Sequence, residues 1–150
     1  MMRRLIFWLV AAFVPAAIGI AFPAPEYYAD LRKPAWAPPT WLFGPAWTVL
    51  YALIGIAAWL VAKRGGPGVR VPLGLWGVQL ALNAAWTPIF FGLRAPGIAL
   101  AEIGVMWVAI AATTVAFFVR RTAAGALMLP YLAWVSFATL LNFEIWRLND

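Results

Sequence analysis

Aromatic side chains are the groups in this chain with the most capacity to bind or react with a ligand. The 150 residues include ten tryptophans, but neither histidine nor cysteine occurs. Ser–His and Cys–His catalysis, His- or Cys-ligated zinc, iron–sulfur clusters and disulfides are therefore excluded, and no metal site is expected. Indole rings stack on flat hydrophobic molecules and can be oxidised, so the remaining chemistry is aromatic.

The aromatic residues recur at helical spacing in three segments, together with small or polar neighbours. The three stripes are Phe43, Trp47 and Tyr51; Asn83, Trp86 and Phe90; and Trp134, Ala138 and Leu141. If they converge, they line a pocket for a flat, hydrophobic ligand that needs few hydrogen bonds. Core packing is the alternative explanation of such stripes.

Two further patterns with a spacing of four lie on opposite sides of one predicted helix. The small residues are Gly77, Ala81 and Ala85, and the polar ones are Gln79, Asn83 and Thr87. The small side predicts a helix–helix contact in a homodimer or within the bundle. The polar side should face inward, either to a cavity or to partners on other helices, because amides are costly in hydrocarbon.

Two acidic residues lie within or at the end of apolar segments. Glu144 is expected to pair with Arg147, three residues later on the same helix. Glu102 has no basic or second acidic residue near it in sequence, so it makes a poor proton relay. We expect it to form a structural hydrogen bond.

These residues are carried by a chain too apolar for a soluble domain. It is 65% hydrophobic and 11% charged, with a mean hydropathy of +0.88. Charges separate the apolar runs, which predicts an all-α integral membrane protein, a single domain over 1–150 built as a five-transmembrane-helix bundle. The predicted helices span about 5–22, 44–63, 72–93, 96–119 and 123–146.

Residues 23–43 form a long first loop in this prediction, because the stretch is rich in proline, tyrosine and tryptophan. Such a connection acts either as a lid over a binding site or as an interfacial anchor. The first span resembles a signal peptide in its Arg3-Arg4 start, but its apolar run is longer than a signal core, so a span is expected.

Basic residues are distributed unevenly between the two predicted faces. Seven lie on the side of the N-terminus, and four lie on the other. The positive-inside rule therefore predicts a cytoplasmic N-terminus. The net charge of +6 is spread in ones and twos between apolar runs, so no nucleic-acid partner is expected.

Several long strings in the chain resemble the translocator protein family, also called tryptophan-rich sensory proteins or peripheral benzodiazepine receptors. They are Leu31-Arg32-Lys33-Pro34-Ala35-Trp36-Ala37-Pro38-Pro39, Gly44-Pro45-Ala46-Trp47, Gln79-Leu80-Ala81-Leu82-Asn83, Pro88-Ile89-Phe90-Phe91-Gly92, Ala112-Thr113-Thr114, Pro130-Tyr131-Leu132-Ala133-Trp134 and Leu141-Asn142-Phe143. The resemblance spans nearly the whole chain.

The resemblance implies a five-helix bundle, often dimeric, with a pocket beneath the first loop. Members of the family bind porphyrins, haem-like tetrapyrroles, sterols and synthetic isoquinoline or benzodiazepine ligands. Transferred to this sequence, the pocket residues are Trp47, Tyr51, Asn83, Trp86, Phe90, Trp134, Ala138 and Leu141, with Trp36 in the covering loop. A receptor or sensor in a bacterial membrane, with no obligatory cofactor, is the function this implies.

Two other functions remain open. Some bacterial members are described as degrading porphyrins in light, a process assigned to tryptophans that correspond to Trp47 and Trp134. Transport of tetrapyrroles or sterols normally requires inverted repeats or broken helices, and none is visible, although Pro15 and Pro88 are placed to kink their helices.

Two features of the sequence narrow the class of ligand that is expected. Animal members carry a sterol-recognition pattern with a central tyrosine, but this chain has Phe143, followed by Arg147, so cholesterol is not expected. Without histidine or cysteine the pocket has no usual axial ligand, so a metal-free porphyrin suits it better than haem.

Overall fold

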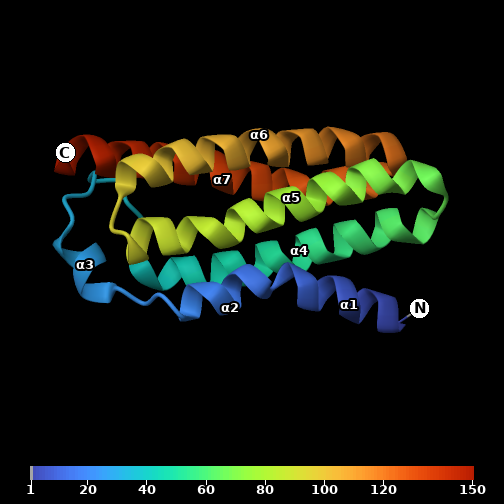
Figure 1. Cartoon of the computed structure of the whole chain (residues 1–150), viewed down its shortest axis with the longest axis horizontal. Coiled ribbons are helices and arrows are strands. Elements are labelled where there is room, and N and C mark those ends of the chain that lie inside the picture. Colours follow the sequence, from blue (N-terminus) through green and yellow to red (C-terminus); the bar gives the residue numbers. More distant parts are fainter. Residues whose placement is uncertain (1) are drawn as a thin grey trace.

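The computed structural model describes residues 2–150, and all regular structure in this range is helical. In chain order the helices are α1 (Met2–Ala12), α2 (Val14–Ile20), α3 (Pro25–Asp30), α4 (Phe43–Arg64), α5 (Arg70–Thr87), α6 (Pro96–Arg120) and α7 (Thr122–Asn149). Shorter segments are the 3-10 turns η1 (Thr40–Leu42) and η2 (Pro67–Val69) and the π-helical η3 (Pro88–Gly92). The long helices lie side by side along one axis, and the two termini lie at opposite ends (Figure 1).

Within residues 2–150, four helical segments are long and apolar enough to cross a membrane. They are Met2–Ile20, Thr40–Arg64, Pro96–Arg120 and Thr122–Asn149. The chain is thus an integral membrane protein, as the composition predicts. α5 is not among the four, since its sequence includes two amides and begins with an arginine. A fifth span remains a prediction.

The order of the helices around the bundle differs from their order in the chain. α4 packs against α1 on one side and α7 on the other, while α6 packs against α7 and α5, and α5 against α2. α4 and α7 are therefore neighbours although the chain passes through α5 and α6 between them (Figure 1). This order brings the aromatic residues of α4 and α7 to one seam.

Two glycines allow helices to approach closely. A Cβ atom on Gly55 of α4 would lie 3.1 Å from Leu9 Cδ2 and 3.2 Å from Ala12 Cβ on α1. A Cβ atom on Gly125 of α7 would overlap the ring of Phe118 on α6. The tight α1–α4 and α6–α7 contacts thus depend on these positions lacking a side chain.

Both prolines expected to kink helices coincide with irregularities. The first helix is interrupted at Phe13, between α1 and α2. Pro15 lies two residues later, in the first turn of α2, and lacks a backbone donor. Pro88 begins the π-helical segment η3, which extends the axis of α5 to Gly92.

The connection between α2 and α4 is more ordered than the predicted loop over 23–43. It contains α3, which begins after Ala24 with Pro25 at its first position, and the turn η1 directly before α4. The prediction of a long loop did not include these two short helical segments. Proline favours the first turn of a helix as well as loops, so a proline-rich stretch is compatible with both.

Candidate functional site

Aromatic residues of α4 and α7 meet at the end of the bundle next to α3. The rings of Trp47 and Tyr51 stack, with centroids 5.3 Å apart and planes at 29°. Trp47 also meets Trp134 of α7 edge to face at 6.4 Å, and Phe43 contacts the same Trp134 at 6.2 Å. Two of the three predicted stripes therefore converge.

The third stripe, on α5 and η3, contacts α7 at Leu141 and Asn142. The rings of Trp86 and Phe90 stack at 4.8 Å with planes at 24°. Trp86 donates its indole N–H to Asn142 Oδ1 on α7 at 3.0 Å, and Asn142 Nδ2 donates to the Pro96 carbonyl at 2.9 Å. One amide thus orients the indole and binds the start of α6.

A buried polar network lies beneath the rings and ties three helices together. The Tyr51 hydroxyl donates to Asn83 Oδ1 at 3.1 Å, and Asn83 Nδ2 donates to the Tyr131 hydroxyl at 2.7 Å. Tyr131 in turn donates to Gln79 Oε1 at 2.6 Å. The inward direction of Gln79 and Asn83 on the polar face of α5 is confirmed, and Asn83 serves as a junction between helices.

The remaining donor of the network has no partner. Gln79 Nε2 is buried and makes no hydrogen bond to any described residue. The same is true of Trp134 Nε1 in the aromatic cluster above. Buried donors without acceptors are costly, so both are available to a ligand or water with an acceptor oxygen.

Trp36 is placed over this end of the bundle by the α2–α4 connection. Trp36 is 48% exposed as a residue. Its ring contacts Phe137 at 5.6 Å, and Phe137 contacts Trp134 at 5.7 Å. Tyr28 of α3 packs on Phe43 at 6.2 Å. Burial raises the pKa of the Tyr28 hydroxyl, which keeps the phenol neutral beneath the connection.

Lys33 stabilises the connection from within. Its ammonium donates to the carbonyls of Tyr28 at 2.7 Å and Leu31 at 3.1 Å, and lies 4.7 Å from the centroid of the Tyr28 ring. A cation at the C-terminal end of α3 satisfies carbonyls that the helix leaves free. The connection is therefore a folded cover held by its own side chains.

Open space adjoins the aromatic cluster on the outer face of the bundle. A groove of about 580 Å³ lies between α4 and α7. Its lining residues are Pro45, Ala46, Val49, Leu50, Pro130, Ala133, Trp134 and Phe137. Among the predicted ligand-binding residues, Trp134 lines this groove and also touches Trp47 on its inner side.

The other predicted site residues lie in the packed interior or on the surface. Leu141 packs with buried Phe90 and with Trp86, while Ala138 and Trp47 both pack against the larger core cluster of the bundle. Gly77 and Ala81 are exposed, and a Cβ atom on Gly77 would meet nothing within 4 Å. Gly77 thus borders open space within residues 2–150, and the homodimer stays a prediction.

Three contributing residues were not singled out from the sequence: Tyr131, Phe137 and Asn142. Tyr131 precedes Trp134 by three positions on α7, so helical spacing could have placed it on the same face. Asn142 follows Leu141 in an apolar run, where an uncharged amide signals a buried hydrogen bond. Phe137 follows Trp134 by three positions, so the same spacing could have found it.

The two acidic residues behave differently. Glu144 pairs with Arg147 as predicted, with Arg147 Nη2 at 2.6 Å from Oε2 and Nε at 3.1 Å from Oε1. The expected hydrogen bond of Glu102 was wrong, because both of its carboxyl oxygens are buried without a partner among residues 2–150. The sequence shows that no partner for Glu102 is near it on its own helix. It does not show which atoms of other helices face the Glu102 carboxyl group.

These features define a helical membrane protein that gathers aromatic side chains from α4, α5 and α7 beneath a folded cover. The sequence profile of the TspO/MBR family matches residues 5–147, and the chain belongs to this family. The resemblance stated from the sequence strings is confirmed.

Curated relatives cover most of the chain. This chain is 47% identical over 142 residues to the tryptophan-rich sensory protein of Cereibacter sphaeroides, and the match covers 95% of this chain and 89% of the relative. It is 48% identical over 127 residues to the translocator protein of Homo sapiens, covering 83% and 75%. Protein CrtK of Rhodobacter capsulatus is 40% identical over 144 residues, covering 95% and 90%.

Proposed function

We propose that this protein is a membrane receptor that binds porphyrins and other flat hydrophobic ligands, such as isoquinoline carboxamides or benzodiazepines, at the Trp47–Trp134 seam. The observation that carries the proposal is the convergence of these two indoles from α4 and α7, 6.4 Å apart, beside a groove of about 580 Å³. Family relatives bear the names sensory protein and translocator protein, in keeping with a receptor role.

The chemistry of the seam suits a tetrapyrrole. Its rings supply stacking surface, and an aromatic pair contributes about 0.5–1.5 kcal/mol beyond the area it buries. Trp134 Nε1, buried without an acceptor, can donate to a carboxylate or ring nitrogen of the ligand. Because the chain has no histidine or cysteine, a metal-free porphyrin is the tetrapyrrole that fits.

Ligand entry requires the seam to open. Trp47 and Trp134 meet edge to face, which leaves no slot for a macrocycle between them. Trp134 must therefore turn toward the groove. Phe137, which packs on Trp134, and Trp36, which packs on Phe137, must then move with it. In this proposal the cover moves to admit the ligand, and the groove receives it.

We further propose that α5, extended by η3 to Gly92, is the fifth membrane span. α5 is flanked by α6 and α2, so it cannot leave the bilayer while they remain in it. Because Gln79 and Asn83 point inward, neither amide faces lipid. A hydropathy average over the sequence counts both amides regardless of the direction in which they point. The exposed Gly77 and Ala81 then face lipid or a second copy of the chain.

Quenching of tryptophan fluorescence by protoporphyrin tests the receptor proposal on the purified chain in detergent. We expect saturable quenching with the wild type and a Kd at least about tenfold higher for the Trp47→Ala/Trp134→Ala double variant, since two stacking surfaces are lost. Trp107→Ala is the matched control, because Trp107 lies on α6 and donates to Ser136, away from the seam. The proposal would be defeated by quenching that does not saturate, or by equal quenching in the wild type and the Trp47→Ala/Trp134→Ala variant.

The same samples distinguish a receptor from an enzyme. Under illumination, porphyrin loss is followed by absorbance against free tryptophan at equal indole concentration. Consumption of at most one porphyrin per protein is the result expected of a receptor. Repeated turnover that depends on Trp47 and Trp134 would instead support light-dependent degradation.

A further inference from the structure

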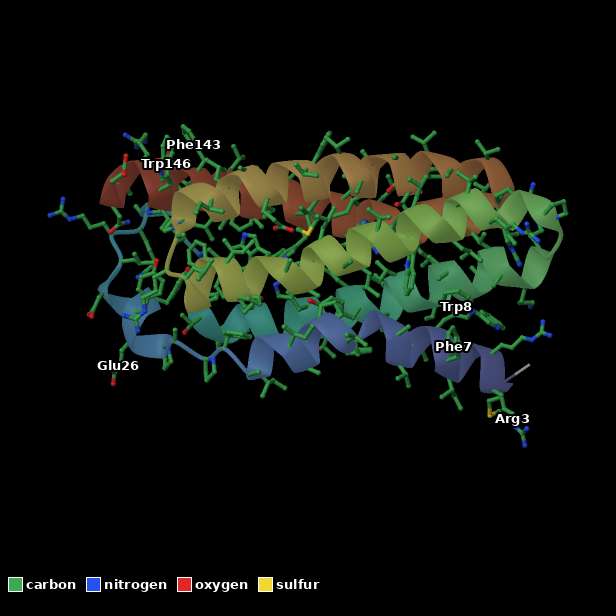
Figure 2. All side chains as sticks on the ribbon, viewed as in Figure 1. Arg3, Phe7, Trp8, Glu26, Phe143 and Trp146 are labelled. Atoms are coloured by element: carbon green, nitrogen blue, oxygen red, sulfur yellow. The ribbon has the colours of Figure 1, made fainter. Side chains whose placement is uncertain are left out.

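The two ends of the bundle differ in charge. The end with the N-terminus has seven basic residues, Arg3, Arg4, Lys63, Arg64, Arg70, Arg120 and Arg121, and the sequence places no acidic residue there. At the other end, four basic residues are balanced by Glu26, Asp30, Glu144 and Asp150. Figure 2 shows Arg3 and Glu26 at these opposite ends. The positive charge of the first end is thus not neutralised by the chain itself.

Two arginines of this end converge on the turn between α4 and α5. Arg64 Nε donates to the carbonyl oxygen of Arg120 at 3.1 Å. The Arg120 guanidinium lies against the backbone of Gly68, where a Cβ atom would be 2.6 Å from Nη1 and 2.9 Å from Cζ. Arg120 Nε is buried and has no partner among the described residues. Two guanidinium groups therefore share one turn without a carboxylate.

Helix termini add to the positive potential. Both α5 and α7 begin at this end, and neither has a side-chain cap or an acidic residue in its first turn. The free N–H groups of a helix N-terminus favour an anion. The neighbouring turn also carries Arg70, the first residue of α5. An anionic group is thus the partner that this arrangement lacks.

The position of the turn favours a lipid as the source of that anion. Arg64 ends α4 and Arg120 ends α6, so both guanidinium groups lie where membrane spans leave the hydrocarbon. The adjacent Lys63 ammonium lies 4.5 Å from the centroid of the Trp59 ring, an aromatic–cation pair of the type found at headgroup depth. We propose that Arg64, Arg120 and the α4–α5 turn bind the phosphate of an anionic phospholipid.

The test uses the full-length chain in nanodiscs of phosphatidylcholine with and without phosphatidylglycerol, with bound lipid counted by native mass spectrometry. A direct hydrogen bond between a guanidinium group and the lipid phosphate should contribute at least about 1 kcal/mol, which the arginines outside the turn do not supply. Arg64→Gln should therefore weaken phosphatidylglycerol binding about fivefold, and Arg64→Gln/Arg120→Gln about thirtyfold. Arg64 is exposed, so its variant should fold, which circular dichroism checks.

Arg3→Gln/Arg4→Gln is the matched control, because it removes the same charge from the same end without touching the turn. Its binding should stay close to wild type. An equal loss in this control would show diffuse attraction and overturn the site, as would equal retention of phosphatidylcholine and phosphatidylglycerol by the wild type. Displacement of the lipid by inorganic phosphate alone would overturn the assignment to a lipid, whereas no displacement supports it.

Discussion

Asn149, the last residue of α7, binds the backbone of Arg32, which belongs to the cover, through both its side-chain oxygen and its side-chain nitrogen. The Arg32 N–H donates to Asn149 Oδ1 at 2.9 Å, and Asn149 Nδ2 donates to the Arg32 carbonyl at 2.8 Å. These residues are 117 positions apart in the chain. The pair fastens the connection over the aromatic seam to the bundle at one point.

Asn149→Ala should loosen the cover. The Arg32 amide loses its hydrogen-bond acceptor, and one such bond contributes about 1 kcal/mol, so its hydrogen exchange should accelerate about fivefold. Exchange measured by NMR or mass spectrometry on residues 31–36 checks this. Core amides of α6 serve as the internal control, and unchanged exchange at Arg32 would contradict the role of Asn149.

Asn83→Leu should destabilise the bundle by about 1–2 kcal/mol. The substitution leaves the buried Tyr51 hydroxyl without an acceptor and removes the donor to Tyr131. Thermal unfolding in detergent measures the loss. Adding Tyr51→Phe in the Asn83→Leu background should cost little further, since the hydroxyl is already without a partner; a fully additive loss would show that the two residues act independently.

Gly125→Ala should separate the α6–α7 hairpin. The new methyl group would overlap the Phe118 ring, and overpacking of this type costs about 1–3 kcal/mol. Gly104→Ala is the control, because its Cβ atom would meet nothing within 4 Å and alanine favours a helix more than glycine does. The melting temperature should fall in the first variant and stay equal or rise in the second. Equal melting temperatures of Gly125→Ala and wild type would contradict the close approach.

Gly77→Leu should weaken a homodimer without affecting ligand binding. Gly77 is exposed on the outer side of α5, away from the inward Asn83, so a larger side chain there blocks only the approach of another helix. Crosslinking in membranes should give fewer dimers than wild type, while porphyrin quenching stays the same. A dimer fraction that does not change would remove the small-residue stripe from the interface.

Much of the helical layout could be derived from the sequence alone. Charges and apolar runs placed the long helices to within a few residues at most ends, because a backbone in lipid must satisfy its own hydrogen bonds within each segment. The inward direction of Gln79 and Asn83 followed from their spacing of four. Both depend on interactions that are local in the chain.

The partners of those residues were decided only by the tertiary structure. Asn83 binds Tyr131, 48 positions away, because α5 and α7 approach one another. The sequence of neither helix indicates that the other is its neighbour. The same reason left Glu102 without its expected hydrogen bond and placed Gly77 and Ala81 on the outside. Hydrophobicity and backbone hydrogen bonding act within a segment, whereas side-chain partners depend on which helices become neighbours around the bundle.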